Sequence, residues 1–382
     1  METYVCGDCV DDYAVKQFIK HHAEELRCDY CRQTSQELPI GAAVNDVGDF
    51  ILEGLEMEWS HPEDEAVAWD SEDGCYVVST VDSYDLVDRY FALESDQLRN
   101  DLANQLGDND WCQRNPYRLT REESWIFDWE QFSEELKHQT RYVFFRVKNE
   151  RDEYGEGVQN LHEIMDEIAT IVLEIGLIRT ISSGTVITRA RPHCEIQQYS
   201  TVEDLGPPSK ELAIHANRMS PSGIPMFYGS DSELTALSEV EQTGFATLAQ
   251  FVTQRAFKVL DLTRIPDVPS IFDRQPHYER APLIFLRNFL ADLTKRVAKD
   301  GREHIEYVPT QVITEYFRRV FLDQDHERVK GIIYPSARNE SGISYVLFFD
   351  NNNCTQDDRN VGTGHWLSMV TRSVRRVDRR DF

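Results

Sequence analysis

Two close pairs of cysteines near the N-terminus offer the clearest chemistry in the sequence. The pairs are Cys6–Cys9 and Cys28–Cys31, each with two residues between the thiols. Two such turns can present four thiolates to one tetrahedral ion, and Zn²⁺ prefers a closed sulfur site of this kind. Because four thiolates leave no coordination position open, we expect a structural zinc site, with four free thiols as the alternative.

A second set of polar side chains lies between Arg218 and Glu239. Arg218 stands before a Ser-Pro-Ser-Gly turn, and an apolar strand that ends in Tyr228 follows the turn. A turn of this composition leaves backbone N–H groups free for an anion or a polar ligand. Ser230 and Glu233 have the spacing of a capping box. This spacing predicts a helix that places Glu239 near its end.

Arg189 and Ser336 resemble Tyr228 and Glu239 in one respect: each is a polar residue at the end of an apolar strand or helix. Arg189 follows Val-Ile-Thr, and Ser336 follows Ile-Ile-Tyr-Pro. Taken singly, each of these residues has an ordinary explanation as a surface cation, a core ring or a turn former. They become a candidate site only if the fold brings them together.

The apolar pattern divides the chain at Gly176. Before this glycine the pattern is mainly helical, and the clearest amphipathic helix runs from Val158 to Ile175. After Gly176 the pattern indicates an α+β fold with short strands and helices packed on them. We expect strands at 178–181, 185–188, 247–252, 256–260, 331–334 and 343–349, and helices at 283–297 and 311–321, the latter capped by Thr310.

The chain is strongly acidic, with 40 basic and 67 acidic side chains and a net charge of −27. This charge disfavours broad binding to nucleic acid or to an anionic membrane, since both need a positive surface. No apolar run reaches the roughly 18 residues that a transmembrane helix needs, and the N-terminus lacks the apolar core of a secretion signal. We therefore expect a cytoplasmic protein without a disulfide framework.

Several segments of the second half resemble the RES domain, a toxin module named for its Arg, Glu and Ser. They occur in the family's order, and the resemblance covers roughly residues 178 to 350. The N-terminal part, with its paired cysteines and acidic helical region, resembles the HEPN-like domain found fused to RES domains. The segments that carry the RES resemblance are 185–191, 218–228, 235–240, 304–311 and 332–338.

The resemblance implies a fold similar to that of diphtheria-toxin-type ADP-ribosyltransferases, with NAD⁺ as substrate. Activities in the family include NAD⁺ degradation by phosphorolysis or hydrolysis, and ADP-ribosyl transfer. Such enzymes typically act as growth-arresting toxins, which leaves an antitoxin or immunity protein and a homo-oligomer open as partners. We expect a zinc module at 1–34, a HEPN-like domain at 35–176, a RES catalytic domain at 177–355 and a basic tail at 356–382.

In the implied site Arg189, Glu239 and Ser336 are the catalytic candidates. Cleavage of the nicotinamide–ribose bond passes through an oxocarbenium-like state, which a carboxylate such as Glu239 can stabilise. The guanidinium of Arg189, or as second choice that of Arg218, can hold the pyrophosphate bidentately. Tyr228 offers a flat face to the nicotinamide ring, and Ser336 is expected to orient Glu239 or a ribose hydroxyl.

Two alternatives and one departure from the family pattern remain. Met219 and Ser220 stand where the family's turn usually has an aromatic residue and Asn, which leaves the turn contacts open.

Active HEPN ribonucleases carry Arg-x(4–6)-His, and this spacing occurs at Arg319–His326 and Arg359–His365, outside the helical region. A ribonuclease is therefore disfavoured. The intact Arg, Glu and Ser argue against a third alternative, an inactive interaction protein.

Overall fold

The computed structural model of the chain describes residues 2–146, 161–194, 198–240, 244–276, 279–297, 301–356 and 364–378. The chain divides into two compact units, and each is made of two separate stretches of sequence. Their boundaries differ from the domain boundaries that we expect from the sequence. Unit 1 comprises Met1–Arg121 and Asp267–Arg280, and unit 2 comprises Glu122–Pro266 and Ala281–Phe382.

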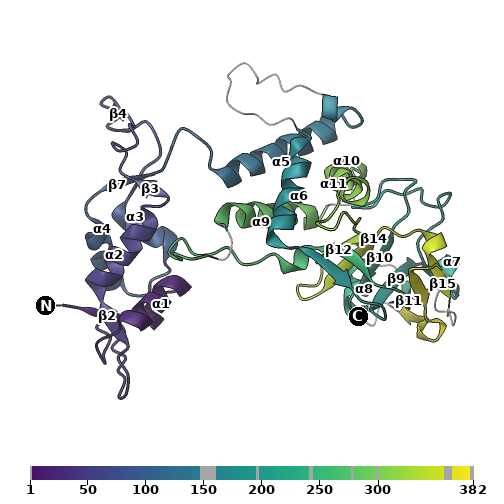
Figure 1. Cartoon of the computed structure of the whole chain (residues 1–382), viewed down its shortest axis with the longest axis horizontal. Helices are drawn as coiled ribbons and strands as arrows, with labels where there is room; N and C mark the ends of the chain where they lie inside the picture. The colour runs from purple at the N-terminus through teal and green to yellow at the C-terminus, as the bar shows by residue number, and fades with distance from the viewer. Residues whose placement is uncertain are drawn as a thin grey trace. The chain divides into compact units, whose positions relative to one another are not determined.

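In its described residues, unit 1 has four α-helices around one apolar core and three small antiparallel sheets. Val47, Ile51 and Leu55, which recur at helical spacing, are all buried in this core. The helices, drawn in purple and blue in Figure 1, are α1 (Tyr13–His22), α2 (Val44–Leu55), α3 (Ser83–Tyr90) and α4 (Asp96–Leu106). The sheets are β1 (Tyr4–Cys6) with β2 (Gly41–Ala43), β3 (Trp59–Ser60) with β7 (Asp110–Gln113) and β6 (Val81–Asp82), and β4 (Trp69–Asp70) with β5 (Cys75–Tyr76).

The segment Asp267–Arg280 belongs to unit 1 although it comes from the second half of the sequence. Its Phe272 is 2% exposed and stacks on Phe91 with ring centroids 5.2 Å apart. A Cβ atom at Gly54 would lie 2.5 Å from Phe272 Cδ1, so this glycine leaves the space that the ring fills. We call Asp267–Arg280 the inserted segment, and it completes the core of unit 1.

Unit 2 contains a ten-stranded, mainly antiparallel sheet. Along the sheet the strand order is β15-β16-β11-β9-β10-β14-β13-β12-β8, and β17 also pairs with β11. The pairs β12–β13 and β15–β16 are parallel. The strands are β8 (Ile178–Ile181), β9 (Val186–His193), β10 (Phe227–Ser230), β11 (Phe245–Thr253), β12 (Phe257–Asp261), β13 (Gly331–Pro335), β14 (Ile343–Leu347), β15 (Cys354–Gln356), β16 (Leu367–Met369) and β17 (Arg375–Asp378).

Seven helices accompany this sheet in the described part of unit 2. Aromatic side chains join two of them: the rings of Trp129 and Phe289 lie 5.0 Å apart, and Trp129 Nε1 donates to Asp292 Oδ2. Every helix that the structure describes falls short of the length and apolarity needed to cross a bilayer. The helices are α5 (Arg121–His138), α6 (Glu163–Ile175), α7 (Val202–Leu205), α8 (Glu233–Glu239), α9 (Arg280–Thr294), α10 (Glu303–Glu306) and α11 (Val308–Arg319).

The expected strands and the mixed α and β character are confirmed, but two helix starts are wrong. Helix α8 is capped by Ser232, whose hydroxyl accepts from Thr235 N, whereas Ser230 is the last residue of β10. Thr310 lies inside α11 rather than at its cap, because the helix already begins at Val308. The predicted amphipathic helix ends at Gly176 as expected, while Val158 lies outside the described residues.

The segment 356–382, expected to be a basic tail, contains two strands of the sheet. Both β16 and β17 pair with β11. Leu367, Met369 and Val377 are buried, so apolar side chains hold a segment whose charge suggested a solvated tail. Residues 357–363 and 379–382 lie outside the described part of the chain.

Asp128 on α5 is expected to make unit 2 less stable at neutral pH than at acidic pH. Burial and the neighbouring charge of Glu167 raise the pKa of the Asp128 carboxyl to about 6. Because the folded-state pKa lies above the unfolded value, the stabilisation is present at low pH and is lost as the pH rises to about 6. Asp128→Asn should raise the melting temperature at pH 8 by about 2–4 °C and change it little at pH 4, since about 1 kcal/mol remains after solvent screening. Equal shifts at both pH values would contradict this account.

Candidate active site and metal centre

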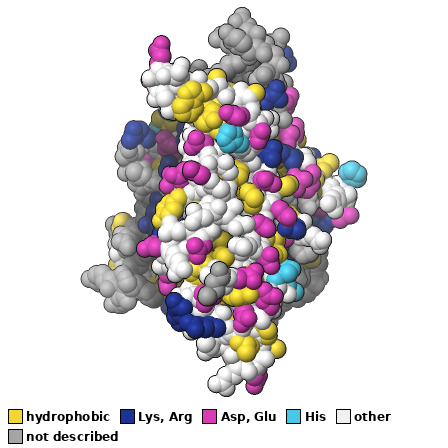
Figure 2. Space-filling view, turned by 90° about the vertical axis from the view of Figure 1, so that its left-hand side faces the viewer, with side chains coloured by type: hydrophobic (Ala, Val, Ile, Leu, Met, Phe, Trp, Pro, Cys, Tyr) yellow, Lys and Arg dark blue, Asp and Glu magenta, His cyan; other side chains and the backbone are white. Residues whose placement is uncertain are grey.

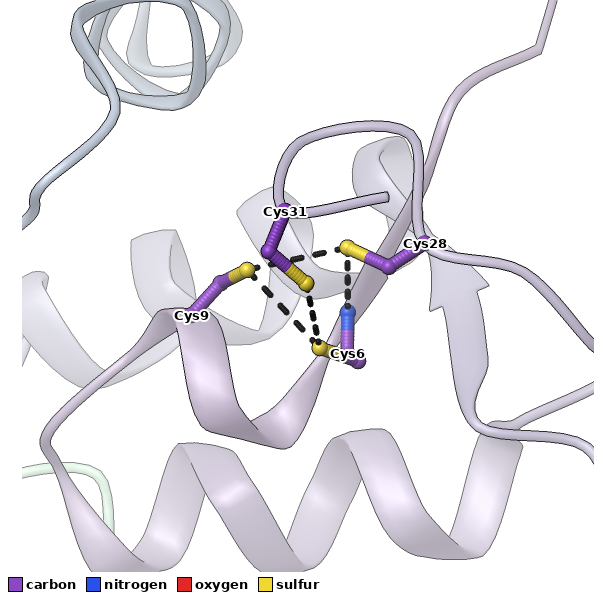
Figure 3. Close-up of side chains that lie close together, drawn as sticks. All are labelled: Cys6, Cys9, Cys28 and Cys31. Carbon is purple, nitrogen blue, oxygen red and sulfur yellow. Dashed lines mark hydrogen bonds between the residues drawn. The ribbon is translucent and has the colours of Figure 1, made fainter. Parts of the chain in front are cut away.

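The four paired cysteines meet in unit 1, as the spacing predicts. Cys6 ends β1, Cys9 ends the short helix η1 (Gly7–Cys9), and the loop 28–31 supplies the other two. The four Sγ atoms lie within 4.8 Å of one another and point toward a common centre (Figure 3). The Sγ–Sγ distances are 3.7 Å for Cys6–Cys9, 3.5 Å for Cys6–Cys31 and 3.6 Å for Cys9–Cys28. These four cysteines could therefore hold a metal ion.

The distances between the sulfur atoms are compatible with zinc. A regular tetrahedron with Zn–S bonds of about 2.3 Å has S–S edges of about 3.8 Å, close to the distances observed here. At Cys28 burial raises the thiol pKa, but the backbone N–H groups of Cys31, Cys6 and Tyr30 outweigh it and bring the pKa down to about 7. A thiolate is the form that a metal ion binds. We propose that the ion is a structural Zn²⁺.

Cys6→Ser is expected to remove the metal. The purified protein should hold about one zinc ion per chain, because a tetrahedral sulfur site with four donors binds one ion. The variant should lose it, since a serine hydroxyl is a poor replacement for a thiolate. Elemental analysis by mass spectrometry measures the content, and Cys75→Ser, an exposed cysteine outside the cluster, is the matched control. Zinc retained by the Cys6 variant would contradict the assignment.

A cavity of about 940 Å³ in unit 2 gathers most of the other candidate residues. Its lining includes Arg189 from β9, Tyr228 from β10, Glu239 from α8, and Arg218 from the turn before β10. Ser336 does not line the cavity, but the next residue, Ala337, does. Cavities of roughly 300–1,000 Å³ are the usual size of small-molecule sites. The fold thus brings four distant segments of the sequence to one cavity.

Glu239 is held in place by hydroxyl groups on one of its two oxygens. Ser336 Oγ donates a short hydrogen bond to Glu239 Oε1, and Ser344 Oγ on β14 donates to the same oxygen at 3.3 Å. Glu239 Oε2 has no hydrogen-bond partner among the described residues. Ser336 Oγ also accepts the backbone N–H groups of Arg338 and Asn339 at 3.2 and 3.1 Å. A hydroxyl with these partners is suited to orient Glu239, not to act as a nucleophile.

Arg189 is anchored to the strand beside it. Its Nη1 donates to the carbonyl oxygen of Tyr228 at 2.6 Å, and its guanidinium lies over the Phe227 ring at 5.5 Å. Its buried Nε has no partner in the described chain. Desolvation lowers the Arg189 pKa to about 10, so the side chain stays charged at neutral pH. The four donors not used by Tyr228 leave capacity for an anion.

The turn that carries Arg218 is fixed by polar contacts on its inner side. Arg218 Nη1 donates to the carbonyl oxygen of Leu293 at 2.9 Å. Ser220 Oγ lies 2.9 Å from the Tyr228 hydroxyl, which ties the turn to the following strand. Met219 is fully buried, so the departure from the family's turn places a core side chain there and a buried hydroxyl at Ser220.

Burial raises the pKa of the Tyr228 hydroxyl to about 12. This hydroxyl therefore stays neutral throughout the physiological range. With Ser220 holding its far end, the ring has a fixed orientation at the cavity wall. An aromatic face fixed in this way can support the flat ring of a ligand.

The cavity lining is more basic than the rest of the chain. Four arginines line it against two carboxylates, whereas the chain as a whole carries a net charge of −27. The further charged residues are Arg296, Arg338 and Glu303, and two histidines, His215 and His304, line the cavity as well. Asp and Glu side chains are scattered over the whole face displayed in Figure 2. A cationic hollow in an acidic protein selects anionic ligands.

The sequence patterns gave no role to Ser344 or Arg296. Ser344 is an inward-facing residue of a strand, and its type alone does not distinguish a core hydroxyl from one that contacts Glu239. Arg296 follows the end of α9, where its Nε donates to the carbonyl oxygen of Ala337 at 3.0 Å. This contact joins segments 41 residues apart, so no local pattern carries it.

Comparison with known families finds two matches. Residues 21–150 match HEPN/RES N-terminal domain 1, and residues 192–369 match the RES domain. The first match begins after Cys6 and Cys9, so it does not include the whole cysteine cluster. No curated protein and no solved structure matches the chain.

Proposed function

Because the chain belongs to the HEPN/RES two-domain family, we propose that it is a toxin-type enzyme that cleaves the nicotinamide–ribose bond of NAD⁺. At the level of the family, a RES domain is consistent with an enzyme that acts on NAD. The observation that best supports the proposal is that Arg189, Arg218, Tyr228 and Glu239 line one basic cavity. Depletion of NAD⁺ would arrest growth, and an antitoxin or immunity protein would then protect the producing cell.

Glu239 is the residue that we assign to the bond-breaking step. As nicotinamide leaves, positive charge develops on the ribose ring, as it does in glycoside hydrolysis. Glu239 Oε2, which bonds to no described residue, can face this charge, while Ser336 and Ser344 hold Oε1. A carboxylate fixed before the reaction stabilises the charge without having to reorganise. Water or phosphate then attacks the ribose carbon.

The arginines are assigned to the pyrophosphate and Tyr228 to the nicotinamide. Arg189 presents a fixed fork, because Nη1 is anchored on a backbone carbonyl. Arg218 is anchored in the same way on Leu293. Two anchored guanidinium groups on one cavity suit the two phosphates of a dinucleotide.

Arg189→Lys is expected to raise KM for NAD⁺ by roughly 10- to 100-fold. The lysine keeps the charge but loses the planar fork, and a hydrogen bond to a charged group contributes about 1.5–3 kcal/mol. Steady-state kinetics measure the change, with Arg191→Lys on the same strand as the control, since Arg191 does not line the cavity. An unchanged KM would remove Arg189 from the pyrophosphate site.

The experiment that tests the proposed function follows nicotinamide release from NAD⁺ by the purified protein. Release that needs inorganic phosphate indicates phosphorolysis, and release without it indicates hydrolysis. NAD⁺ labelled in the adenosine part shows whether ADP-ribose becomes attached to a protein, the alternative reaction. If RNA is degraded while NAD⁺ stays intact, the proposal is wrong and the HEPN-type ribonuclease is favoured.

We also propose that the sheet of unit 2 has the architecture of diphtheria-toxin-type ADP-ribosyltransferases. Its central strands β9, β10, β13 and β14 carry or border Arg189, Tyr228, Ser336 and Ser344. The proposal rests on this placement and on the RES match.

A further inference from the structure

Three residues spaced four apart connect α8 to the segment between β13 and β14. They are Asp231, Thr235 and Glu239, and this spacing puts them on one face of the helix and of the residues that lead into it. Each contacts a different part of the segment 336–343, which we call the 336–343 turn. The three contacts therefore form one line, with Glu239 at its end.

The two outer contacts fix the ends of the 336–343 turn. Asp231 N donates to the carbonyl oxygen of Ile343 at 3.0 Å, and Ile343 N donates to Asp231 Oδ1 at 3.1 Å. At the other end Ser336 Oγ donates to Glu239 Oε1. The turn is closed on itself as well, since Ser336 N donates to the carbonyl oxygen of Gly342 at 2.8 Å.

The middle contact joins Thr235 to Asn339. Thr235 is fully buried, and its Oγ1 accepts from Asn339 Nδ2 at 2.9 Å. Asn339 also donates its backbone N–H to Ser336 Oγ at 3.1 Å. Asn339 is thus bonded at once to the helix that carries Glu239 and to the hydroxyl that orients Glu239.

Gly342 allows the middle contact to be this close. A Cβ atom at Gly342 would lie 2.5 Å from Thr235 Oγ1 and 2.8 Å from Asn339 Nδ2. Real Cβ atoms do not approach other heavy atoms so closely, so any side chain here would push the turn away from α8. The absence of a side chain keeps Thr235 and Asn339 in contact.

We propose that Thr235 and Asn339 are positioning residues for Glu239, an inference that rests on the proposed cleavage of NAD⁺. Their hydrogen bond sets the distance between α8 and the 336–343 turn, and so holds Ser336 Oγ against Glu239 Oε1. Without this bond the middle of the 336–343 turn loses its contact with α8, and the remaining links are those of Asp231 with Ile343 at one end and of Ser336 and Ser344 with Glu239 at the other. Neither Thr235 nor Asn339 lines the cavity, so neither touches the substrate.

Thr235→Val and Asn339→Ala test the proposal. Each should lower kcat for nicotinamide release by roughly 10- to 100-fold, because a small displacement of a reacting group has an effect of this size. KM should stay within about twofold, since the arginines that bind substrate are untouched. Thr235→Ser restores the accepting oxygen and should recover most of the lost kcat. Ser238→Ala is the control and should leave kcat unchanged, because the Ser238 hydroxyl donates to the carbonyl oxygen of Thr235 and to no other residue in the described part of the chain.

Two further measurements separate positioning from a general loss of structure. In a Ser336→Ala background, Asn339→Ala should cause little additional loss, because it acts through Ser336; independent, multiplying losses would overturn the proposal. The proposal would also be overturned if Thr235→Val and Asn339→Ala lowered the melting temperature along with kcat, and if Thr235→Ser did not recover the lost kcat.

Failure of the proposed function would leave this inference testable. If the wild-type protein released no nicotinamide, a crystal structure of Asn339→Ala would decide the matter. Loss of the contact between Ser336 Oγ and Glu239 Oε1 in that structure supports the positioning role. A contact unchanged from the wild-type protein overturns it.

Discussion

Glu239→Gln is expected to lower the rate of nicotinamide release from NAD⁺ by about 1,000-fold. Glutamine keeps the size of the side chain and can still accept from Ser336 and Ser344, but it lacks the negative charge that faces the developing oxocarbenium ion. Removal of one preorganised electrostatic contact at a reacting centre typically reduces kcat by about 100- to 1,000-fold. The measurement is a chromatographic assay of nicotinamide at saturating NAD⁺.

The matched control for this variant is Glu233→Gln. Glu233 lies on the same helix α8, but its carboxylate pairs with Arg375 and does not line the cavity. Its replacement should leave the rate within about twofold, as is usual for exposed ion pairs. A Glu239→Gln variant as active as the control would mean that the bond is broken without this carboxylate.

Phe272→Ala is expected to destabilise unit 1 by about 3–5 kcal/mol, the usual range for removal of a buried phenylalanine ring. The ring is 2% exposed, stacks on Phe91 and meets Tyr90 edge-on at 5.8 Å. Since Gly54 cannot fill the vacated space, a cavity would remain in the core. Hydrogen exchange measured by mass spectrometry should show faster exchange in α2 and α3.

Tyr117→Ala controls for the loss of an aromatic residue in unit 1. Tyr117 is 62% exposed, so its removal should leave exchange in α2 and α3 unchanged. If Phe272→Ala exchanged no faster than this control, the inserted segment would be a surface attachment and not a part of the core.

Those elements of the fold whose stability arises locally could be predicted from the sequence. The helix that ends at Gly176 has a period of apolar residues that matches its buried face, and its C-terminal glycine adopts a φ of 77°, which costs glycine little. The strand Ile178–Ile181 carries β-branched side chains at three of its four positions, the exception being Arg179. Such signals need no knowledge of distant partners.

Elements that depend on distant partners could not be predicted in the same way. The inserted segment shows no helix or strand pattern, and Phe272 is buried because distant residues of unit 1 receive its ring: Gly54 leaves the space, and Phe91 and Tyr90 contact the ring. The composition of Arg375–Asp378 is typical of a solvated basic segment, yet the segment pairs with β11. Backbone hydrogen bonds make this pairing, so the side-chain types do not predict it. The basic composition of this segment correctly predicted that its arginines are exposed, but it did not predict that the segment is a strand.

The candidate site also has features that the sequence predicts and features that depend on distant partners. The residue types of Arg189, Glu239 and Ser336 and their places at the ends of elements drew attention to them. The approach of Arg189 and Glu239 to one cavity depends on strand order, in which β10 lies between β9 and β14. The hydrogen bonds of Ser336 and Ser344 to Glu239, and of Asn339 to Ser336, depend on it as well. Strand order depends on contacts between residues far apart in the chain, so it could not be predicted from this one sequence.

The most direct test of the central claim is a crystal structure of Glu239→Gln soaked or grown with NAD⁺. We expect the dinucleotide in the cavity of unit 2, with its pyrophosphate on Arg189 and Arg218, its nicotinamide against Tyr228 and its ribose beside residue 239. NAD⁺ bound elsewhere on the protein, or an empty cavity at saturating NAD⁺, would contradict it.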